Sequence, residues 1–329
     1  MRAGESAGSA ITRSVELAQH VEQWGYKRYW LAEHHSISGL ACSATPVLIG
    51  HVAGATKTIR VGSGGVMLPN HAPLVVAEQF GTLEALYPGR IDLGLGRAPG
   101  GDYQTMQALR RDTQQGGDDF PLLLAELRTY LGPERPAQVV KAIPGQGSKV
   151  PITLLGSSGF SAQLAGMLGL PFAFAAHFAP ANLFAAAQLY RERFQPSEVL
   201  RKPYLMIGVQ VIAAETDAAA RRLFTTPQQR FLRLIRNQPV ELLPPVDSME
   251  GLWQDDGERA AVQRKLGAAI VGSDATVRAG LEKLVSDTGA DEAIIVTDTY
   301  EHADRLESYQ RVAGIAAMIE VKTRETVGV

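Results

Sequence analysis

The sequence contains almost no cysteine, no long hydrophobic run and no marked excess of charge. Its single cysteine, Cys42, excludes an internal disulfide framework and a metal site built from several thiolates. No stretch approaches the roughly 18 consecutive apolar residues that a membrane-spanning helix needs. With 32 basic and 34 acidic residues, nothing favours binding to nucleic acid or to an anionic membrane. The start, MRAGESAGSA, lacks the apolar core of a secretory signal, so we expect a soluble cytoplasmic protein.

Short apolar segments alternate with amphipathic segments along almost the whole chain. The apolar ones predict strands near 26–32, 59–66, 90–95, 151–156, 172–176, 204–213 and 292–297. The amphipathic ones predict helices near 10–24, 44–57, 73–86, 118–130, 159–169, 181–194, 216–236, 274–288 and 301–318. Ser9 is expected to cap the first helix and Gly25 to end it. Repeated βα units favour an α/β fold whose parallel sheet is closed as a barrel or open and doubly wound.

The predicted strands are one short of an eightfold (β/α) barrel, a fold that a single domain of 329 residues can form. Because the chain begins in what reads as the loop before the first helix, we expect the missing strand upstream of Met1. Alternatively, residues 133–150 fill the gap. That Pro- and Gly-rich segment reads as a loop or small hairpin, and the long irregular segment 238–257 as a functional or disordered loop.

The stretch IDLGLGRAPGG (91–101) runs from a predicted strand into a glycine-rich turn. It is not a dinucleotide fingerprint, because Pro99 stands where the third glycine belongs. Glycine before Arg97 would let a planar ligand approach the backbone while the guanidinium reaches a phosphate or ring oxygen. A salt bridge at the mouth of a barrel explains the arginine equally well.

A second turn, Gly156-Ser157-Ser158-Gly159, joins a predicted strand to the helix that contains Phe160. Free N–H groups at the helix start and two serine hydroxyls suit a phosphate dianion. Ordinary capping of the helix by serine is the alternative. Position favours phosphate, because barrels bind phosphates at such junctions on the C-terminal face.

A third glycine-rich stretch, VGSGGV, places Gly64 and Gly65 inside a predicted strand. Paired glycines weaken a strand, so we expect a close backbone approach or a strained peptide there. A simple turn is the alternative.

The stretch WLAEHH puts Glu33 beside His34 and His35, two of only seven histidines. Adjacent residues of a strand point to opposite faces, so this spacing argues against a metal site unless the strand has ended. A histidine at the end of a barrel strand, with a carboxylate beside it, suits acid–base or hydrogen-bonding chemistry. A structural histidine–carboxylate cluster remains open.

Together these stretches resemble the bacterial luciferase-like flavin-dependent monooxygenases, in particular their small bacterial oxidoreductase branch. The resemblance covers nearly the whole chain and rests on AEHH, GSGGVMLPNHAPLVVAEQFGTLEALYPGRIDLGLGRAPG, LGSS and VGSDATVRAGLEKLVSDTGADE. It implies a single TIM barrel over residues 1–329, lacking its first strand, that binds FMN at its C-terminal mouth.

The resemblance also implies roles for individual residues. His34 corresponds to the active-site histidine, with His35 beside it, and the Gly64–Gly65 link to a non-proline cis peptide against the flavin. Arg97 corresponds to the arginine at the flavin and its phosphate. The turn of Gly156, Ser157 and Ser158 through Phe160 corresponds to the phosphate-binding loop, and residues 238–257 to a mobile lid.

The expected activity is therefore oxidation of a small organic substrate by dioxygen and reduced FMN, the latter delivered by a separate reductase. We further expect a homodimer and no metal ion. Two rivals remain: hydride transfer with a deazaflavin, and a non-catalytic flavin-binding barrel. Luciferase carries a reactive cysteine where this chain has Gly96, which argues against light emission.

Overall fold

The computed structural model describes residues 1–98, 103–109 and 118–327. Pro99, used above to reject a dinucleotide motif, lies outside these residues. Within them, every pair of neighbouring strands is parallel. The strands are β1 (Arg28–Leu31), β2 (Arg60–Met67), β3 (Ile91–Gly96), β4 (Ile152–Gly156), β5 (Phe172–Ala175), β6 (Leu205–Ala213), β7 (Ile270–Gly272) and β8 (Glu292–Val296).

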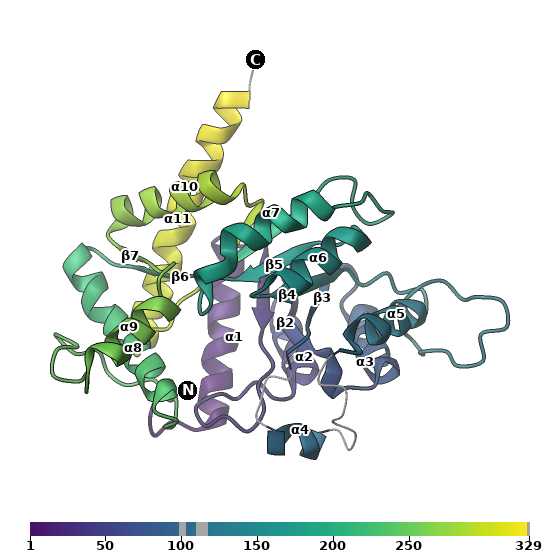
Figure 1. The fold of residues 1–329 in the computed structure, drawn as a ribbon, viewed down its shortest axis with the longest axis horizontal. Coiled ribbons are helices and arrows are strands. Elements are labelled where there is room, and N and C mark those ends of the chain that lie inside the picture. Colours follow the sequence, from purple (N-terminus) through teal and green to yellow (C-terminus); the bar gives the residue numbers. More distant parts are fainter. Residues whose placement is uncertain (99–102, 110–117, 328–329) are drawn as a thin grey trace.

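The sheet curls into a partial barrel with helices on its outer face (Figure 1). β1 to β6 pair in chain order, β8 pairs with β6 along residues 206–210, and short β7 pairs with the end of β6. The helices are α1 (Ala7–Gln23), α2 (Thr45–Ala55), α3 (Pro73–Leu86), α4 (Tyr103–Leu109), α5 (Phe120–Leu131), α6 (Gly159–Leu168), α7 (Leu183–Arg193), α8 (Asp217–Ile235), α9 (Asp256–Lys265), α10 (Asp274–Thr288) and α11 (His302–Val327).

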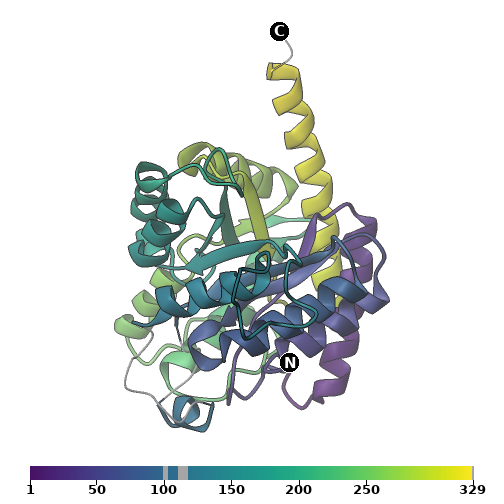
Figure 2. The same cartoon turned by 90° about the vertical axis from the view of Figure 1, so that its right-hand side faces the viewer.

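The hydrophobic core lies between the sheet and the surrounding helices. β3 and β6 are buried at every position, as expected for parallel strands covered on both faces. The largest fully buried side chains include Phe80, Phe120 and Tyr190, which come from α3, α5 and α7. Helix α11 begins in this core and extends well beyond the body of the molecule (Figures 1 and 2). None of the described helices is long and apolar enough to cross a bilayer.

Most predicted elements are confirmed, with corrections to the first helix and to three short elements. Ser6, not Ser9, caps α1: its side chain accepts from the Ser9 amide, so the helix begins one turn early. α4, α9 and β7 were not predicted, because α4 has only seven residues, the short α9 is strongly polar and β7 has only three residues. Gly25 does end α1, with φ of +84°.

A charged layer fills the concave side of the sheet; it consists of Arg28, Arg60, Asp92 and Glu292. Asp92 is 3% exposed and accepts from Arg28 and Arg60, each at 2.6 Å. Trp30 Nε1 donates to the same carboxylate at 3.0 Å. Since Arg28 on β1 reaches Asp92 on β3, across β2, these side chains project into the interior of the curled sheet. The layer plugs that interior at the end opposite the carboxyl ends of the strands.

The barrel is open between β1 and β8, as the strand count predicted. The described residues of these two strands form no backbone pairing with each other, and we call this gap the seam. Side chains bridge it: Arg28 Nε and Nη2 donate to the two carboxylate oxygens of Glu292 at 2.6 and 3.1 Å. Tyr309 on α11 donates its hydroxyl to the Ile295 carbonyl at 3.0 Å, which satisfies an acceptor on β8.

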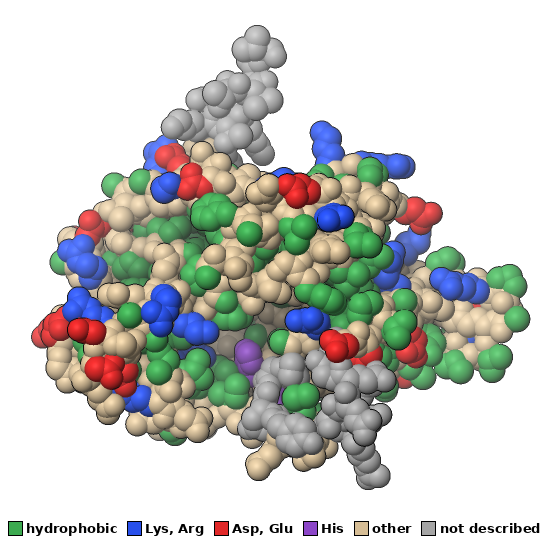
Figure 3. All heavy atoms as spheres, viewed as in Figure 1, with side chains coloured by type: hydrophobic (Ala, Val, Ile, Leu, Met, Phe, Trp, Pro, Cys, Tyr) green, Lys and Arg blue, Asp and Glu red, His purple; other side chains and the backbone are tan. Residues whose placement is uncertain are grey.

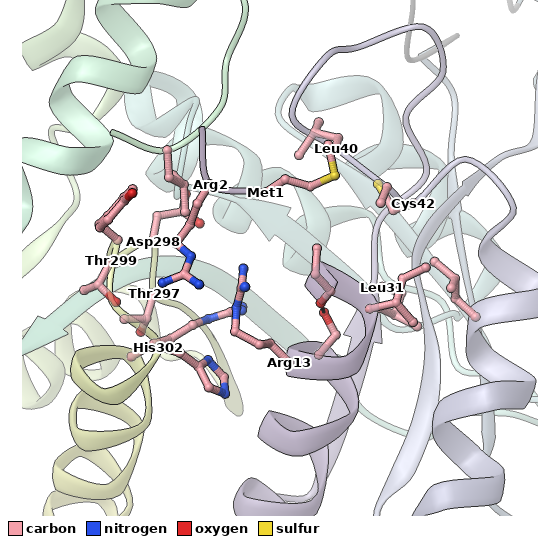
Figure 4. Close-up of a pocket in the computed structure, with 18 of the residues that line it drawn as sticks. Met1, Arg2, Arg13, Leu31, Leu40, Cys42, Thr297, Asp298, Thr299 and His302 are labelled. Atoms are coloured by element: carbon pink, nitrogen blue, oxygen red, sulfur yellow. Dashed lines mark hydrogen bonds between the residues drawn. The ribbon is translucent and has the colours of Figure 1, made fainter. Parts of the chain in front are cut away.

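A cavity of about 200 Å³ opens at the carboxyl end of the seam (Figure 4). Leu31 and Cys42 line it on the β1 side and Thr297 and Asp298 on the β8 side, with Met1 and Arg13 between them.

The alternative that residues 133–150 fill the seam is wrong. Their Gly145 packs against α3, so closely that a Cβ on Gly81 would lie 2.2 Å from the Gly145 Cα. Since α3 connects β2 to β3, this segment covers a different part of the barrel. As predicted, it forms an irregular loop.

Candidate functional site

The carboxyl ends of the strands bring several chemically active side chains to one mouth. His34 follows β1, Arg97 follows β3, His177 follows β5 and Asp298 follows β8. Because parallel strands end at a common edge, these residues share one end of the barrel. The space-filling view shows a hollow on this surface with a histidine side chain inside it (Figure 3).

Arg97 and Phe160 meet at this mouth, although they come from different βα units. The Arg97 guanidinium carbon lies 4.2 Å from the centroid of the Phe160 ring, a cation–π contact. Phe160 occupies the first turn of α6 and is 36% exposed. No salt bridge joins Arg97 to another residue within 1–98, 103–109 and 118–327. The guanidinium is partly buried and lies beside an aromatic ring.

The turn before α6 has the form expected of an anion-binding loop. Gly156 ends β4, and a Cβ there would lie 2.7 Å from the Ser161 side chain, so only glycine fits. Ser158 occupies the N-cap position but its side chain makes no capping hydrogen bond. Capping by the serine hydroxyl, the alternative reading of this motif, is thus not observed. The N–H groups of the first turn and the hydroxyls of Ser157 and Ser158 remain available to a ligand.

The Gly64–Gly65 peptide in β2 is cis, in agreement with the resemblance. A Cβ on Gly64 would lie 3.1 Å from the Trp30 side chain, and one on Gly65 would lie 2.7 Å from the Gly94 carbonyl oxygen. With Gly94 and Gly96 on β3, these residues form a strip of backbone without side chains. At each of these positions the space that a side chain would fill is occupied by other protein atoms, so glycine is required for the close packing of the strands.

Glu33 binds two histidines with one carboxylate oxygen. His35 Nε2 and His71 Nε2 each lie 2.8 Å from Glu33 Oε1, and the Met67 amide donates to Oε2 at 3.2 Å. Burial alone would raise the pKa of the Glu33 carboxyl, but the hydrogen bonds from His71, His35 and Met67 outweigh burial and lower that pKa. The carboxylate is therefore charged at neutral pH and holds both rings in place.

His34 and His35 diverge, but not because of strand alternation. β1 ends at Leu31, so both histidines lie in the following loop. His35 turns to Glu33, whereas His34 takes no part in that cluster and is among the groups that lower the pKa of His177. Ser43 Oγ donates to the His34 carbonyl at 2.9 Å and holds the loop. The structure thus separates one histidine at the mouth from one in a structural cluster.

A metal ion was not expected from the His34–His35 spacing. Glu33, His35 and His71 nevertheless have potential ligand atoms within 4.8 Å of one another. His34 is not part of this group, and the hydrogen bonds described above account for all three side chains. His71 joins this group through its contact with Glu33, 38 residues away in the sequence. The spacing of residues 33–35 alone could not reveal that contact.

The sequence-based selection missed His177, which lies directly after β5 in the stretch FAFAAHF. Asp298, His34 and Arg230 face it, from the ends of β8 and β1 and from α8. Arg230 Nη1 pairs with Asp298 Oδ2 at 2.9 Å. Burial lowers the pKa of His177 to about 4, so its ring is neutral at pH 7. His177 follows a predicted strand just as His34 does, so the same sequence signal marks both histidines.

We expect the depressed pKa of His177 to make folding stability fall in mild acid. Above about pH 6.5 the ring is neutral in both states, whereas at lower pH only the unfolded chain takes up the proton. The free energy of unfolding should therefore fall by up to about 3 kcal/mol as the pH drops from about 6.5 towards 4. Denaturant titrations of wild type and His177→Gln across this range measure the effect. Equal losses in the two proteins would contradict the assigned pKa.

Comparison with known proteins identifies the family. A profile described as luciferase-like monooxygenase matches residues 1–314. YvbT of Bacillus subtilis is 56% identical over 313 residues, covering 95% of this chain and 93% of YvbT. A luciferase-like monooxygenase of Escherichia coli K12 is 51% identical over 307 residues, covering 93% and 91%. N-acetyl-S-alkylcysteine monooxygenase of Bacillus subtilis is 42% identical over 176 residues, covering 52% and 53%.

Solved structures share the fold. Apo-MsnO8 is 36% identical with a TM-score of 0.85 and coverage of 96% and 95%. The oxygenating constituent of 3,6-diketocamphane monooxygenase of Pseudomonas putida, in complex with FMN, is 20% identical with a TM-score of 0.72, covering 95% and 94%. An F420-dependent secondary alcohol dehydrogenase is 14% identical with a TM-score of 0.66, covering 93% and 94%. Together with the profile match, these findings establish that the chain belongs to the luciferase-like monooxygenase family.

Proposed function

We propose that the protein is an FMN-dependent monooxygenase that oxidises a small organic substrate with dioxygen. The observation that carries this proposal is the convergence of Arg97 and Phe160 beside the uncapped start of α6. A cation, an aromatic face and free N–H groups suit a ligand that has both a phosphate and a flat ring. Reduced FMN, supplied by a separate reductase, would provide the electrons with which dioxygen is activated.

The residues present fit FMN in three respects. The N–H groups of the first turn of α6, with Ser157 and Ser158, would hold the phosphate. The cis-linked Gly64 and Gly65, from which no side chain projects, would lie against the flavin ring. Arg97 supplies a positive charge between these two regions. His34, at the end of β1, would hold or move a proton at its imidazole.

Residues 238–257 would act as the lid of the site. Ser38 Oγ donates to Glu241 Oε1, and a Cβ on Gly39 would lie 2.7 Å from the Glu241 amide. The segment therefore packs on the loop that carries His34 and His35. A cover in this position would exclude water from the mouth. We further propose a cytoplasmic homodimer, which light scattering of the purified protein tests.

A deazaflavin is the rival cofactor, since F420-dependent enzymes share this fold. The greater likeness to a monooxygenase relative of 51% identity favours FMN. The mass and absorption spectrum of the copurified cofactor distinguish the two. Oxygen-dependent product formation separates both a deazaflavin dehydrogenase and a non-catalytic flavin-binding barrel from the proposed enzyme.

Arg97→Ala should weaken FMN binding by at least about tenfold, because a hydrogen bond to a charged group contributes about 1.5–3 kcal/mol. Fluorescence titration of FMN measures the change. Arg201→Ala, an exposed arginine after α7, is the matched control and should bind FMN like wild type. Equal affinity of the Arg97 variant and wild type would refute the assigned anchor.

A further inference from the structure

His177 occupies space that a glycine leaves inside the barrel. Gly208 on β6 pairs with Ala175 on β5 and with Ile294 on β8. A Cβ on Gly208 would lie 2.7 Å from His177 Nδ1, closer than two such atoms can approach. The glycine therefore admits the imidazole to the concave side of the sheet, next to the position of its own missing side chain.

The ring has a buried edge and an accessible edge. His177 Nδ1 is buried and has no partner in normal hydrogen-bond geometry among the described residues, although the Gly208 backbone beside the ring acts to raise the pKa of the imidazole. The residue as a whole is only partly buried, and Nε2 is not among the buried side-chain atoms that lack a hydrogen-bond partner, so Nε2 is the nitrogen that a ligand at the mouth can reach. Phe178 packs edge-on against the imidazole, with ring centroids 4.7 Å apart, and fixes its plane. The imidazole is thus held rigidly with one nitrogen towards the mouth.

The position of His177 separates it from the proposed cofactor residues. Gly64, Arg97 and Phe160 belong to β2, to the end of β3 and to the start of α6 after β4. His177 lies on the other side of the mouth, after β5, where it faces His34, Asp298 and Arg230. Arg230 and Asp298 already pair with each other, so their charges offset. This side of the mouth offers a ligand neutral hydrogen-bonding groups rather than a net charge.

We propose that His177 is a substrate-binding residue whose Nε2 hydrogen-bonds an uncharged polar group of the substrate, such as a carbonyl, opposite His34. This inference rests on the proposed function, because only an enzyme has a substrate. It states that the part of the substrate nearest His177 is uncharged. A carboxylate or phosphate at this position would need a cation to balance its charge. Arg230, the arginine that acts on His177, is already paired with Asp298.

Titration with two neutral carbonyl probes, cyclohexanone and octanal, tests the assignment. Nitrogen-15 spectra of histidine-labelled protein are recorded with and without FMN. We expect a probe to shift the His177 Nε2 resonance and to bind roughly three- to tenfold more weakly to His177→Ala, the range for a neutral hydrogen bond. His177→Gln, which keeps a polar group and most of the volume, should recover part of the affinity. FMN binding should remain nearly unchanged in both variants.

Two further variants make the result decisive. Gly208→Ala, whose added Cβ displaces the imidazole without removing it, should weaken the probe like His177→Ala. His51→Ala, an exposed histidine of α2, should behave as wild type. If neither probe binds wild type, or if both bind His177→Ala and Gly208→Ala unchanged, the proposal is wrong. Loss of FMN affinity with unchanged probe binding would also overturn it. Failure of wild type to bind FMN would refute the proposed function separately, because the probes are also titrated without FMN.

Discussion

His34→Ala should lower turnover roughly 100-fold or more while leaving FMN affinity nearly intact, the range for loss of a general acid or base. The reason is geometric: His34 lies in the loop after β1 and is among the groups that act on the pKa of His177. His35, by contrast, is held by Glu33 at 2.8 Å, so its replacement removes a structural hydrogen bond. Oxygen uptake with reduced FMN and substrate measures the first effect, and thermal unfolding the second.

His35→Ala is the matched comparison for His34→Ala. It should reduce turnover less and lower the melting temperature more, because Glu33 is buried and would lose one of its two histidine partners. Similar turnover losses in the two variants would show that the loop does not divide the roles of these residues. A large loss of FMN affinity in His34→Ala would instead move His34 into the cofactor site.

Asp92→Ala should lower the free energy of unfolding by about 3–5 kcal/mol, the cost of breaking a buried ion pair. Asp92 is 3% exposed and is the shared partner of Arg28 and Arg60. Its removal leaves two guanidinium groups close together in the interior, with Glu292 as the remaining carboxylate of the charged layer. That loss is large against the roughly 5–15 kcal/mol by which a typical domain is stable.

Urea titration of Asp92→Ala and Asp92→Asn measures this loss, and the asparagine should recover part of it through its hydrogen bonds. Asp247→Ala is the control, because the Asp247 side chain is 93% exposed and pairs with exposed Arg222. Breaking that surface pair should change stability by about 1 kcal/mol or less. Comparable losses at the buried and exposed positions would mean that the charged layer is not a stabilising feature of the barrel.

The sequence was sufficient to predict helices and strands with a clear pattern of apolar residues, and motifs whose geometry depends only on neighbouring residues. β3 and β6 were recognised because they are mostly apolar, each with a single polar or charged side chain, and α10 was predicted to the residue. The cis Gly64–Gly65 peptide followed from the resemblance alone. The partners of Glu33 and the bridge from Arg28 to Glu292 could not be predicted, because they join residues distant in the chain. His177 was visible in the sequence, but its burial beside Gly208 required the sheet register.

The seam between β1 and β8 has a consequence for the size of the barrel. In a ring closed by backbone hydrogen bonds, the number of strands and their stagger fix the circumference in discrete steps. Here the last link is the side-chain clasp of Arg28 and Glu292, whose length depends on methylene groups. At this one point the distance between β1 and β8 is therefore set by the length of two side chains rather than by backbone pairing. Glu292→Asp would shorten the clasp by a single carbon and so draw β1 and β8 together at the end of the barrel opposite the mouth, while leaving every residue at the mouth unchanged.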